Sequence, residues 1–161
     1  MITETSVGDC MKRHVVVVTA STTVQEAARV VVEKHVGTLP VVDENGLLIG
    51  VVGVQDLLRV FMPDFVALLN NIDFVRDFGA LEQVQPKDVS EAARLTVSDL
   101  AEAPVAVEED SGLMHALTTI VKHQLQDLPI VDEAGRLVGI ASRVDIAAAF
   151  FAAWTHEEPS S

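Results

Sequence analysis

One motif occurs twice in this chain, and the repeat limits the folds open to it. The stretch LPVVDENGLLIG at residues 39–50 returns as LPIVDEAGRLVG at residues 128–139. The same shift relates residues on both sides of the motif. Internal repetition at such a distance indicates two copies of one structural unit. We therefore divide the chain into a first repeat at residues 1–60, a linker at 61–96 and a second repeat at 97–161.

Each copy predicts the order strand, helix, hairpin, helix. In the first copy, the β-branched run Val15–Val18 is typical of a buried strand. Thr23 and Glu26 form a capping box, which predicts the start of a helix. The pair Asn45–Gly46 tolerates positive φ and predicts a tight hairpin turn. A second helix is expected from about Asp56.

The second copy repeats this order, which predicts a mixed α/β fold of two pseudo-symmetric β-α-β-β-α units. Its first strand is expected at 105–107, and its first helix should be capped by Asp110 or Ser111. In the linker, apolar residues at helical spacing predict an extra amphipathic helix over about 64–81. A unit of this size cannot bury both faces of its small sheet alone. We therefore expect the copies to pack together with approximate two-fold symmetry and paired clefts between them.

Charge and composition exclude several classes of function. With 24 acidic and 11 basic residues, the net charge of −13 makes nucleic acid an unlikely partner. The single cysteine fits a reducing compartment. No leader and no membrane-spanning run is expected, so we predict a cytoplasmic protein with no membrane contact. The five histidines lack metal-site spacing and no phosphate-binding glycine loop is present, so we expect neither an enzyme nor a required cofactor.

The doubled pattern LPVVD-x-x-G-x-x-x-G-V-V-x-x-x-D resembles the cystathionine-β-synthase (CBS) domain, and the tandem pair resembles a Bateman module. The resemblance implies a non-catalytic regulatory module that binds an adenosine-containing ligand in the clefts between repeats. AMP, ADP, ATP, adenosine and S-adenosylmethionine are the ligands it suggests. In this family, a Gly-h-h-Ser/Thr-x-x-Asp segment (h, apolar) supplies a hydroxyl to ribose or phosphate and a carboxylate to the ribose hydroxyls.

Carried onto this chain, the resemblance favours the second copy as the site. Its segment 139–145 keeps both the hydroxyl of Ser142 and the carboxylate of Asp145, whereas the first copy has Gly53 in place of the hydroxyl and keeps Asp56. Both acids have an alternative role as helix N-caps. The apolar wall of the favoured cleft is expected from Val105, Ala106 and Ile130, and the corresponding wall in the first copy from Val16 and Val17.

The predicted ligand carries little negative charge. Relatives often place His or Arg before the Leu-Pro of the hairpin, but here those positions are Gly37–Thr38 and Gln126–Asp127. The basic cluster at 12–14 could reach a phosphate across the pseudo-two-fold axis, or could be a solvated loop. An acid near a phosphate is costly in a partly dry cleft. Adenosine or S-adenosylmethionine is therefore preferred to ATP.

The last helix predicts self-association. Its apolar stripe consists of Ile146, Ala149, Phe150, Ala153 and Trp154, with Phe151 adding exposed bulk. We expect a homodimer formed through residues 145–154 and the linker helix. The alternative function is a ligand-free interaction module that acts through this dimer. If a ligand is sensed, the effector must be a separate protein, because the two repeats account for most of the chain.

Overall fold

The fold was analysed in a computed structural model, in which residues 5–62 and 89–156 are described. The first part contains η2 (Val7–Asp9), α1 (Val24–Lys34), β1 (Thr38–Val42), β2 (Leu48–Gly53) and α2 (Val54–Arg59). The second contains α4 (Val89–Ala92), α5 (Val97–Leu100), β3 (Val107–Glu108), α6 (Leu113–His123), β4 (Asp127–Val131), β5 (Leu137–Ser142) and α7 (Arg143–His156). The helix predicted at 64–81 lies outside the described residues.

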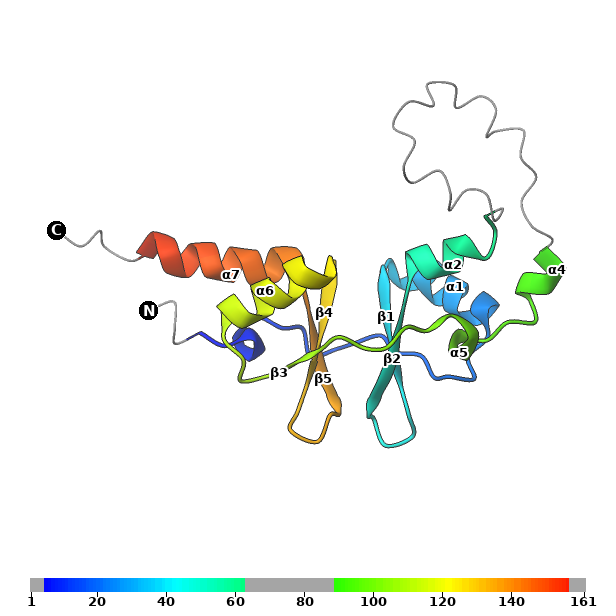
Figure 1. Ribbon diagram of the computed structural model, residues 1–161, viewed down its shortest axis with the longest axis horizontal. Helices are drawn as coiled ribbons and strands as arrows, with labels where there is room; N and C mark the ends of the chain where they lie inside the picture. Colours follow the sequence, from blue (N-terminus) through cyan, green and yellow to red (C-terminus); the bar gives the residue numbers. More distant parts are fainter. Residues whose placement is uncertain (1–4, 63–88, 157–161) are drawn as a thin grey trace, which may run out of the picture.

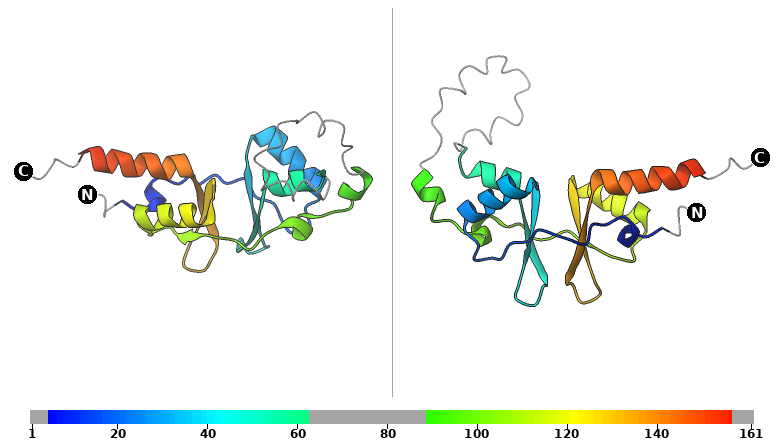
Figure 2. Two further views of the ribbon diagram at one scale, coloured as in Figure 1. Left: turned by 45° about the horizontal axis from the view of Figure 1, so that its top comes forward. Right: turned by 180° about the vertical axis from the view of Figure 1, so that it is seen from behind.

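The predicted pair of similar units is confirmed. Two sheet-and-helix units stand side by side, with α1 and α2 on one and α6 and α7 on the other (Figure 1). The helices of both units lie toward one side of the molecule and the hairpin tips toward the opposite side (Figure 2). Within the described residues, no helix has the length and apolarity needed to cross a membrane.

The two hairpins have the same register, as the repeat predicts. Leu39 pairs with Val52 in the first, and Leu128 pairs with Ala141 in the second. The β1–β2 turn passes through Gly46 at φ +79°, in the left-handed region that favours glycine. The second sheet gains a third strand, β3, which runs parallel to β4.

The predicted N-terminal cap of the first helix is correct in the first repeat and wrong in the second. The Thr23 hydroxyl accepts the Glu26 backbone N–H at 3.0 Å, and the Glu26 carboxylate accepts the Thr23 N–H at 3.0 Å, so the predicted capping box is confirmed. The predicted cap at 110 or 111 is wrong. Helix α6 begins after Gly112, whose extended backbone starts the helix without a side-chain cap.

The strand predicted at Val15–Val18 is also wrong. Of these four residues, all described in the structure, Val18 alone pairs with a strand, through one parallel bridge to Val41. Its N–H donates to Pro40 O and its carbonyl accepts from Val42 N, each at 3.0 Å. The rest of the run crosses from one unit to the other, so its β-branched side chains do not face a partner strand.

Each repeat lends its N-terminal segment to the core of the other. Val7 is fully buried with α6 and β4 of the second unit, and Val97 is fully buried with α1 and β1 of the first. Two-way backbone bonds join Lys12 to Ile140 and Glu102 to Val51 at 2.8–3.1 Å. We call residues 6–12 and 95–102 the crossing segments. Their exchange means that neither unit has a complete core without the other repeat.

The hairpin tips also join the two units. The Leu48 N–H donates to Gly135 O at 3.1 Å, and the Leu137 N–H donates to Gly46 O at 3.0 Å. Together with the exchanged segments, these bonds fix the relative position of the two sheets.

Candidate functional site

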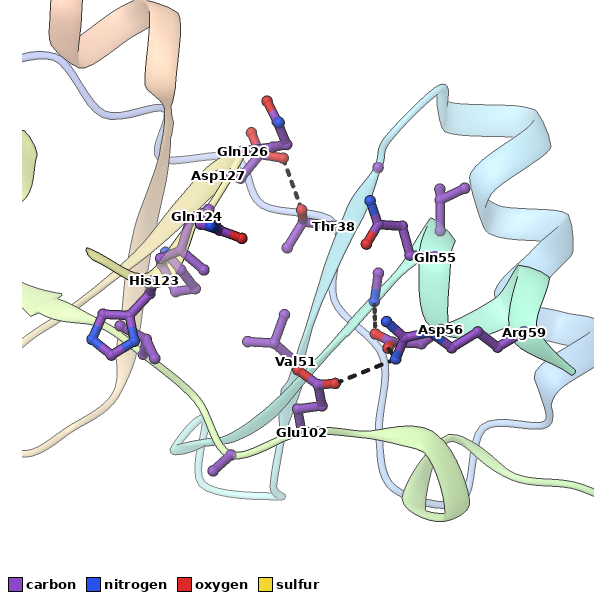
Figure 3. A pocket seen from close by; sticks show the side chains of 17 residues that line it. Thr38, Val51, Gln55, Asp56, Arg59, Glu102, His123, Gln124, Gln126 and Asp127 are labelled. Atoms are coloured by element: carbon purple, nitrogen blue, oxygen red, sulfur yellow. Dashed lines mark hydrogen bonds and ion pairs between the residues drawn. The ribbon is translucent and has the colours of Figure 1, made fainter. Parts of the chain in front are cut away.

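The larger cleft between the units, which we call the first cavity, has a volume of about 700 Å³. The first repeat contributes the end of β2 and the start of α2, including Gly53, Asp56 and Arg59. The second contributes Glu102, Val105 and the segment 123–127 (Figure 3). The cavity therefore brings together three of the predicted site residues, Gly53, Asp56 and Val105.

The carboxylate of Asp56 is held by its own helix. One oxygen accepts the Gly53 N–H at 2.8 Å, and the other lies 3.6 Å from the Arg59 guanidinium. Arg59 also lies 3.9 Å from Glu102 of the crossing segment that pairs with β2 at Val51. The predicted alternative of Asp56 as the N-cap residue is wrong, because Gly53 is the N-cap of α2; Asp56 is the third residue of the helix, and its carboxylate accepts the N–H of that N-cap residue while its side chain lines the cavity. With Asp127 at the edge, the first cavity has three carboxylates and one guanidinium.

The second cavity is the pseudo-symmetric counterpart and has about 350 Å³. Its lining includes Lys12, His14 and His35, with Val15 and Val16 as apolar wall. The Lys12 ammonium lies 3.9 Å from a carboxylate oxygen of Asp145, so Asp145 pairs with a lining residue, although neither Asp145 nor Ser142 is itself part of the lining. Two residues of the basic cluster predicted at 12–14, Lys12 and His14, therefore line this cavity.

Ser142 and Asp145 hold each other at the start of α7. The Ser142 hydroxyl accepts the Asp145 N–H at 3.0 Å, and the Asp145 carboxylate accepts the Ser142 N–H at 3.3 Å. The Asp145 side chain is still 32% exposed. Capping and contact with solvent thus coexist in this residue.

The predicted walls are assigned to the wrong clefts. Val105 lines the first cavity with Asp56, and Val16 lines the second beside Asp145. The reason is that the chain crosses between units before each of these positions. Ile130 is fully buried in the second core and forms no cleft wall. Ala106 is half-buried outside both linings, and Val17 is 41% exposed.

Comparison with known proteins now identifies the fold. A sequence model of the CBS domain matches residues 7–63 and again 97–152. The chain belongs to the CBS domain family. It is a tandem pair, and such pairs are generally regulatory and non-catalytic.

Two relatives share the pair along most of this chain. CBSX2, a chloroplastic CBS domain-containing protein of Arabidopsis thaliana, is 31% identical over 150 residues, covering 88% of this chain and 61% of the relative. Chloroplastic CBSX1 of the same plant is 32% identical, covering 88% and 62%. This CBS pair thus spans about three fifths of the length of these relatives.

Solved structures show the same architecture. The crystal structure of CBSX2 in complex with AMP is 31% identical, with a TM-score of 0.67, covering 92% of this chain and 98% of that one. The cytosolic domain of the Mg²⁺ channel MgtE in complex with ATP is 25% identical, with a TM-score of 0.65, covering 90% and 48%. The first of these structures was solved with AMP and the second with ATP.

Several cleft residues of this CBS pair were not predicted as site residues. Arg59 and Glu102 in the first cavity, and His35 in the second, carry no motif of their own. A partial signal existed, because Lys12 and Glu102 hold corresponding positions at the start of the two repeats. This correspondence alone does not predict a site, because the sequence does not show that Lys12 pairs with the second hairpin and Glu102 with the first.

The single thiol lies close to the second cavity but is poorly suited to attack a substrate. Cys10 Sγ donates to Val7 O at 3.3 Å. Burial, reinforced by the charges of Asp145 and Asp9, raises the pKa of the Cys10 thiol above its ordinary value of 9.0. The thiol is accordingly protonated at neutral pH, and the thiolate needed for nucleophilic attack is scarce.

Proposed function

We propose that this CBS pair binds an adenosine nucleotide, AMP first, in the second cavity and thereby regulates a separate protein. The observation that carries the proposal is the Lys12 ammonium, 3.9 Å from the Asp145 carboxylate on a cavity that His14 also lines. This arrangement offers an acceptor for ribose hydroxyls and a cation for phosphate within one cleft. The 31% identical CBSX2, solved with AMP, supports the choice of ligand class.

The chemistry of the second cavity suits a nucleoside monophosphate. A carboxylate accepts hydrogen bonds from both hydroxyls of a ribose, which is the role we assign to Asp145. The Ser142 hydroxyl stands beside it, bonded at 3.0 Å to the Asp145 N–H. Val15 and Val16 provide the apolar surface for the base. A volume near 350 Å³ lies within the usual range of about 300–1,000 Å³ for small-molecule pockets.

The preference for a ligand with little negative charge rests on the lack of cations before each Leu-Pro. The second cavity obtains cationic and titratable groups from elsewhere, namely Lys12, His14 and His35. We therefore place AMP ahead of adenosine and S-adenosylmethionine. ATP remains disfavoured, because Asp127 also lines this cavity.

Isothermal titration of AMP into ligand-stripped protein tests the proposal. Asp145→Asn should weaken AMP binding at least tenfold, because the amide has one acceptor oxygen and no charge where the carboxylate has two oxygens that accept from the ribose hydroxyls. The matched control is Asp56→Asn, the same change at the corresponding position of the first repeat, which should alter affinity less than twofold. The amide oxygen of asparagine can still accept the N–H of Gly53 or of Ser142, so both variants should fold.

Three results would each contradict a part of this assignment. Wild-type protein that binds none of adenosine, AMP, ADP, ATP and S-adenosylmethionine would remove the sensing function. Equal losses of AMP affinity in Asp145→Asn and Asp56→Asn would contradict the assignment of AMP to the second cavity. Tighter binding of S-adenosylmethionine than of AMP would keep the cleft but replace its ligand.

Regulation would follow from a shift between orientations of the two repeats. A ligand favours one orientation only by its differential affinity for the two. The second cavity is lined from both repeats, so a bound nucleotide would contact both. A separate effector would then recognise the favoured orientation.

An interaction module that works as a homodimer is the second candidate function. The specific observation behind it is the outer face of α7, where Val144, Phe151 and Trp154 are 74%, 56% and 61% exposed. Large apolar side chains grouped on one helix face favour a partner surface. The stripe predicted for this dimer has to be redrawn, because Ile146 is fully buried and Ala149 and Phe150 pack on the same core.

A further inference from the structure

We infer that Asp127 sets the ligand charge that both cavities of this CBS pair accept. Asp127 is the first residue of β4, and Thr38 is the first residue of β1 at the corresponding position of the other repeat. The Thr38 hydroxyl donates to the Asp127 carboxylate at 2.8 Å across the boundary between the units (Figure 3). This bond joins the two repeats where their clefts meet. The inference rests on the proposed nucleotide site.

The two residues form a wall shared by the clefts. Thr38 and Asp127 line both the first and the second cavity, and both are half-buried. A carboxylate on a shared wall contributes negative potential to each cavity at once. Partial burial reduces the screening of this charge by solvent, so it acts on a ligand in either cleft.

The other charges decide what this contribution does in each cleft. The second cavity has Lys12 near Asp145 and the two histidines 14 and 35, so it can offset a monophosphate. Each further phosphate must be accommodated against Asp127. In the first cavity Arg59 already lies near two carboxylates, Asp56 and Glu102, and Asp127 adds a third. Asp127 therefore disfavours longer phosphate chains in the second cavity and phosphates altogether in the first.

Asp127→Asn isolates the charge from the contact. Asparagine has the same shape, and its amide oxygen can still accept from the Thr38 hydroxyl. Glu133→Gln is the matched control, because it removes one carboxylate charge from an exposed residue of the β4–β5 turn in the same repeat. Thr38→Val is the complementary variant, because it removes the hydrogen bond and keeps the Asp127 charge.

The experiment is isothermal titration of adenosine, AMP, ADP and ATP, without magnesium, into the wild type and the three variants. In Asp127→Asn we expect adenosine affinity to stay within twofold and nucleotide affinity to rise about threefold for each negative charge on the ligand, as expected for unit charges several ångströms apart in a partly screened site. Glu133→Gln should leave the whole series unchanged. Thr38→Val should shift all four ligands by one common factor.

The outcomes separate this inference from the proposed function. If wild type binds AMP and Asp127→Asn changes adenosine as much as ATP, Asp127 has a structural role and the charge inference is overturned. The charge inference is also overturned if Asp127→Asn leaves the affinities for all four ligands unchanged. The same holds if Glu133→Gln raises nucleotide affinity with ligand charge as much as Asp127→Asn does. If neither wild type nor Asp127→Asn binds any of the four compounds, the nucleotide site itself is refuted and the inference falls with it.

Discussion

Gly139 and Gly50 are the residues that let the crossing segments lie against the hairpins. A Cβ on Gly139 would come within 2.8 Å of Met11 Cγ and 3.0 Å of the Lys12 carbonyl oxygen. A Cβ on Gly50 would lie 3.2 Å from the Glu102 carbonyl oxygen. Both positions belong to the doubled motif, and both face the segment that arrives from the other repeat.

Gly139→Ala should lower the free energy of unfolding by about 1–3 kcal/mol, the usual cost of overpacking a core. The backbone carbonyl of Lys12 cannot move without loosening the hydrogen bond that it accepts from the Ile140 N–H. Urea denaturation followed by circular dichroism measures the change. Gly37→Ala is the matched control, because a Cβ there meets nothing within 4 Å. Equal stabilities of the two variants would show that the crossing segment does not pack as described.

At this scale the sequence named the important acids but could not separate their roles. Asp56 and Asp145 were predicted either as helix N-caps or as ligand contacts. Each accepts the N–H of the residue three positions earlier; Asp56 also lines the first cavity, and Asp145 pairs with Lys12, which lines the second. Val105 and Val16 were assigned to the wrong clefts. The cleft that a residue lines depends on the unit against which its chain segment packs. The sequence motif around the residue does not specify that unit.

Helix α1 is the element that the sequence predicted best, and its start is fixed by one capping box. Thr23→Ala should cost about 1 kcal/mol of unfolding free energy, the typical loss of an N-cap side chain. The matched control is Thr118→Ala in α6, which like α1 is 11 residues long. The Thr118 hydroxyl bonds back to the Met114 carbonyl within the helix, so its removal should be neutral or slightly stabilising. Chemical denaturation compares the two; a loss in Thr118→Ala as large as that in Thr23→Ala would contradict the assigned cap.

Elements defined by local chemistry were predictable, and elements defined by distant partners were not. The hairpin turn needs positive φ at Gly46, and Asp43 accepts the N–H groups of Asn45 and Leu47 at 2.9 Å, so residues 43–47 specify it. The β-branched run at 15–18 satisfies strand propensity equally well, yet Val18 alone pairs there. A strand exists only where a neighbouring strand offers its free backbone groups.

The whole molecule is a pair of units that complete each other. The repeat predicted two copies and clefts between them, and the structure agrees. The exchange of segments 6–12 and 95–102 was not predictable, because Val7 and Val97 hold corresponding positions and would fill either core equally well. Because the two segments have the same hydrophobic pattern, the sequence does not show whether each packs on its own repeat or on the other one. The exchange also explains why Lys12, far from Asp145 in sequence, lies beside it.

The outer face of α7 predicts how the whole molecule assembles. We expect a two-fold dimer in which Phe151 and Trp154 of each copy are covered by the other, because a stable interface of about 1,200–2,000 Å² needs large apolar contacts. Phe151→Glu should convert the dimer to a monomer in sedimentation equilibrium.

The matched control for this dimer is Val32→Glu. Val32 on α1 is an apolar side chain of the other unit, and it is 71% exposed. The same charge placed there should leave the dimer intact. If Val32→Glu also dissociates it, the interface extends over the helices of both repeats. If wild-type protein sediments as a monomer at micromolar concentration, α7 is not a self-association surface. The interaction-module alternative would then lose its basis, and nucleotide sensing would remain as the function to test.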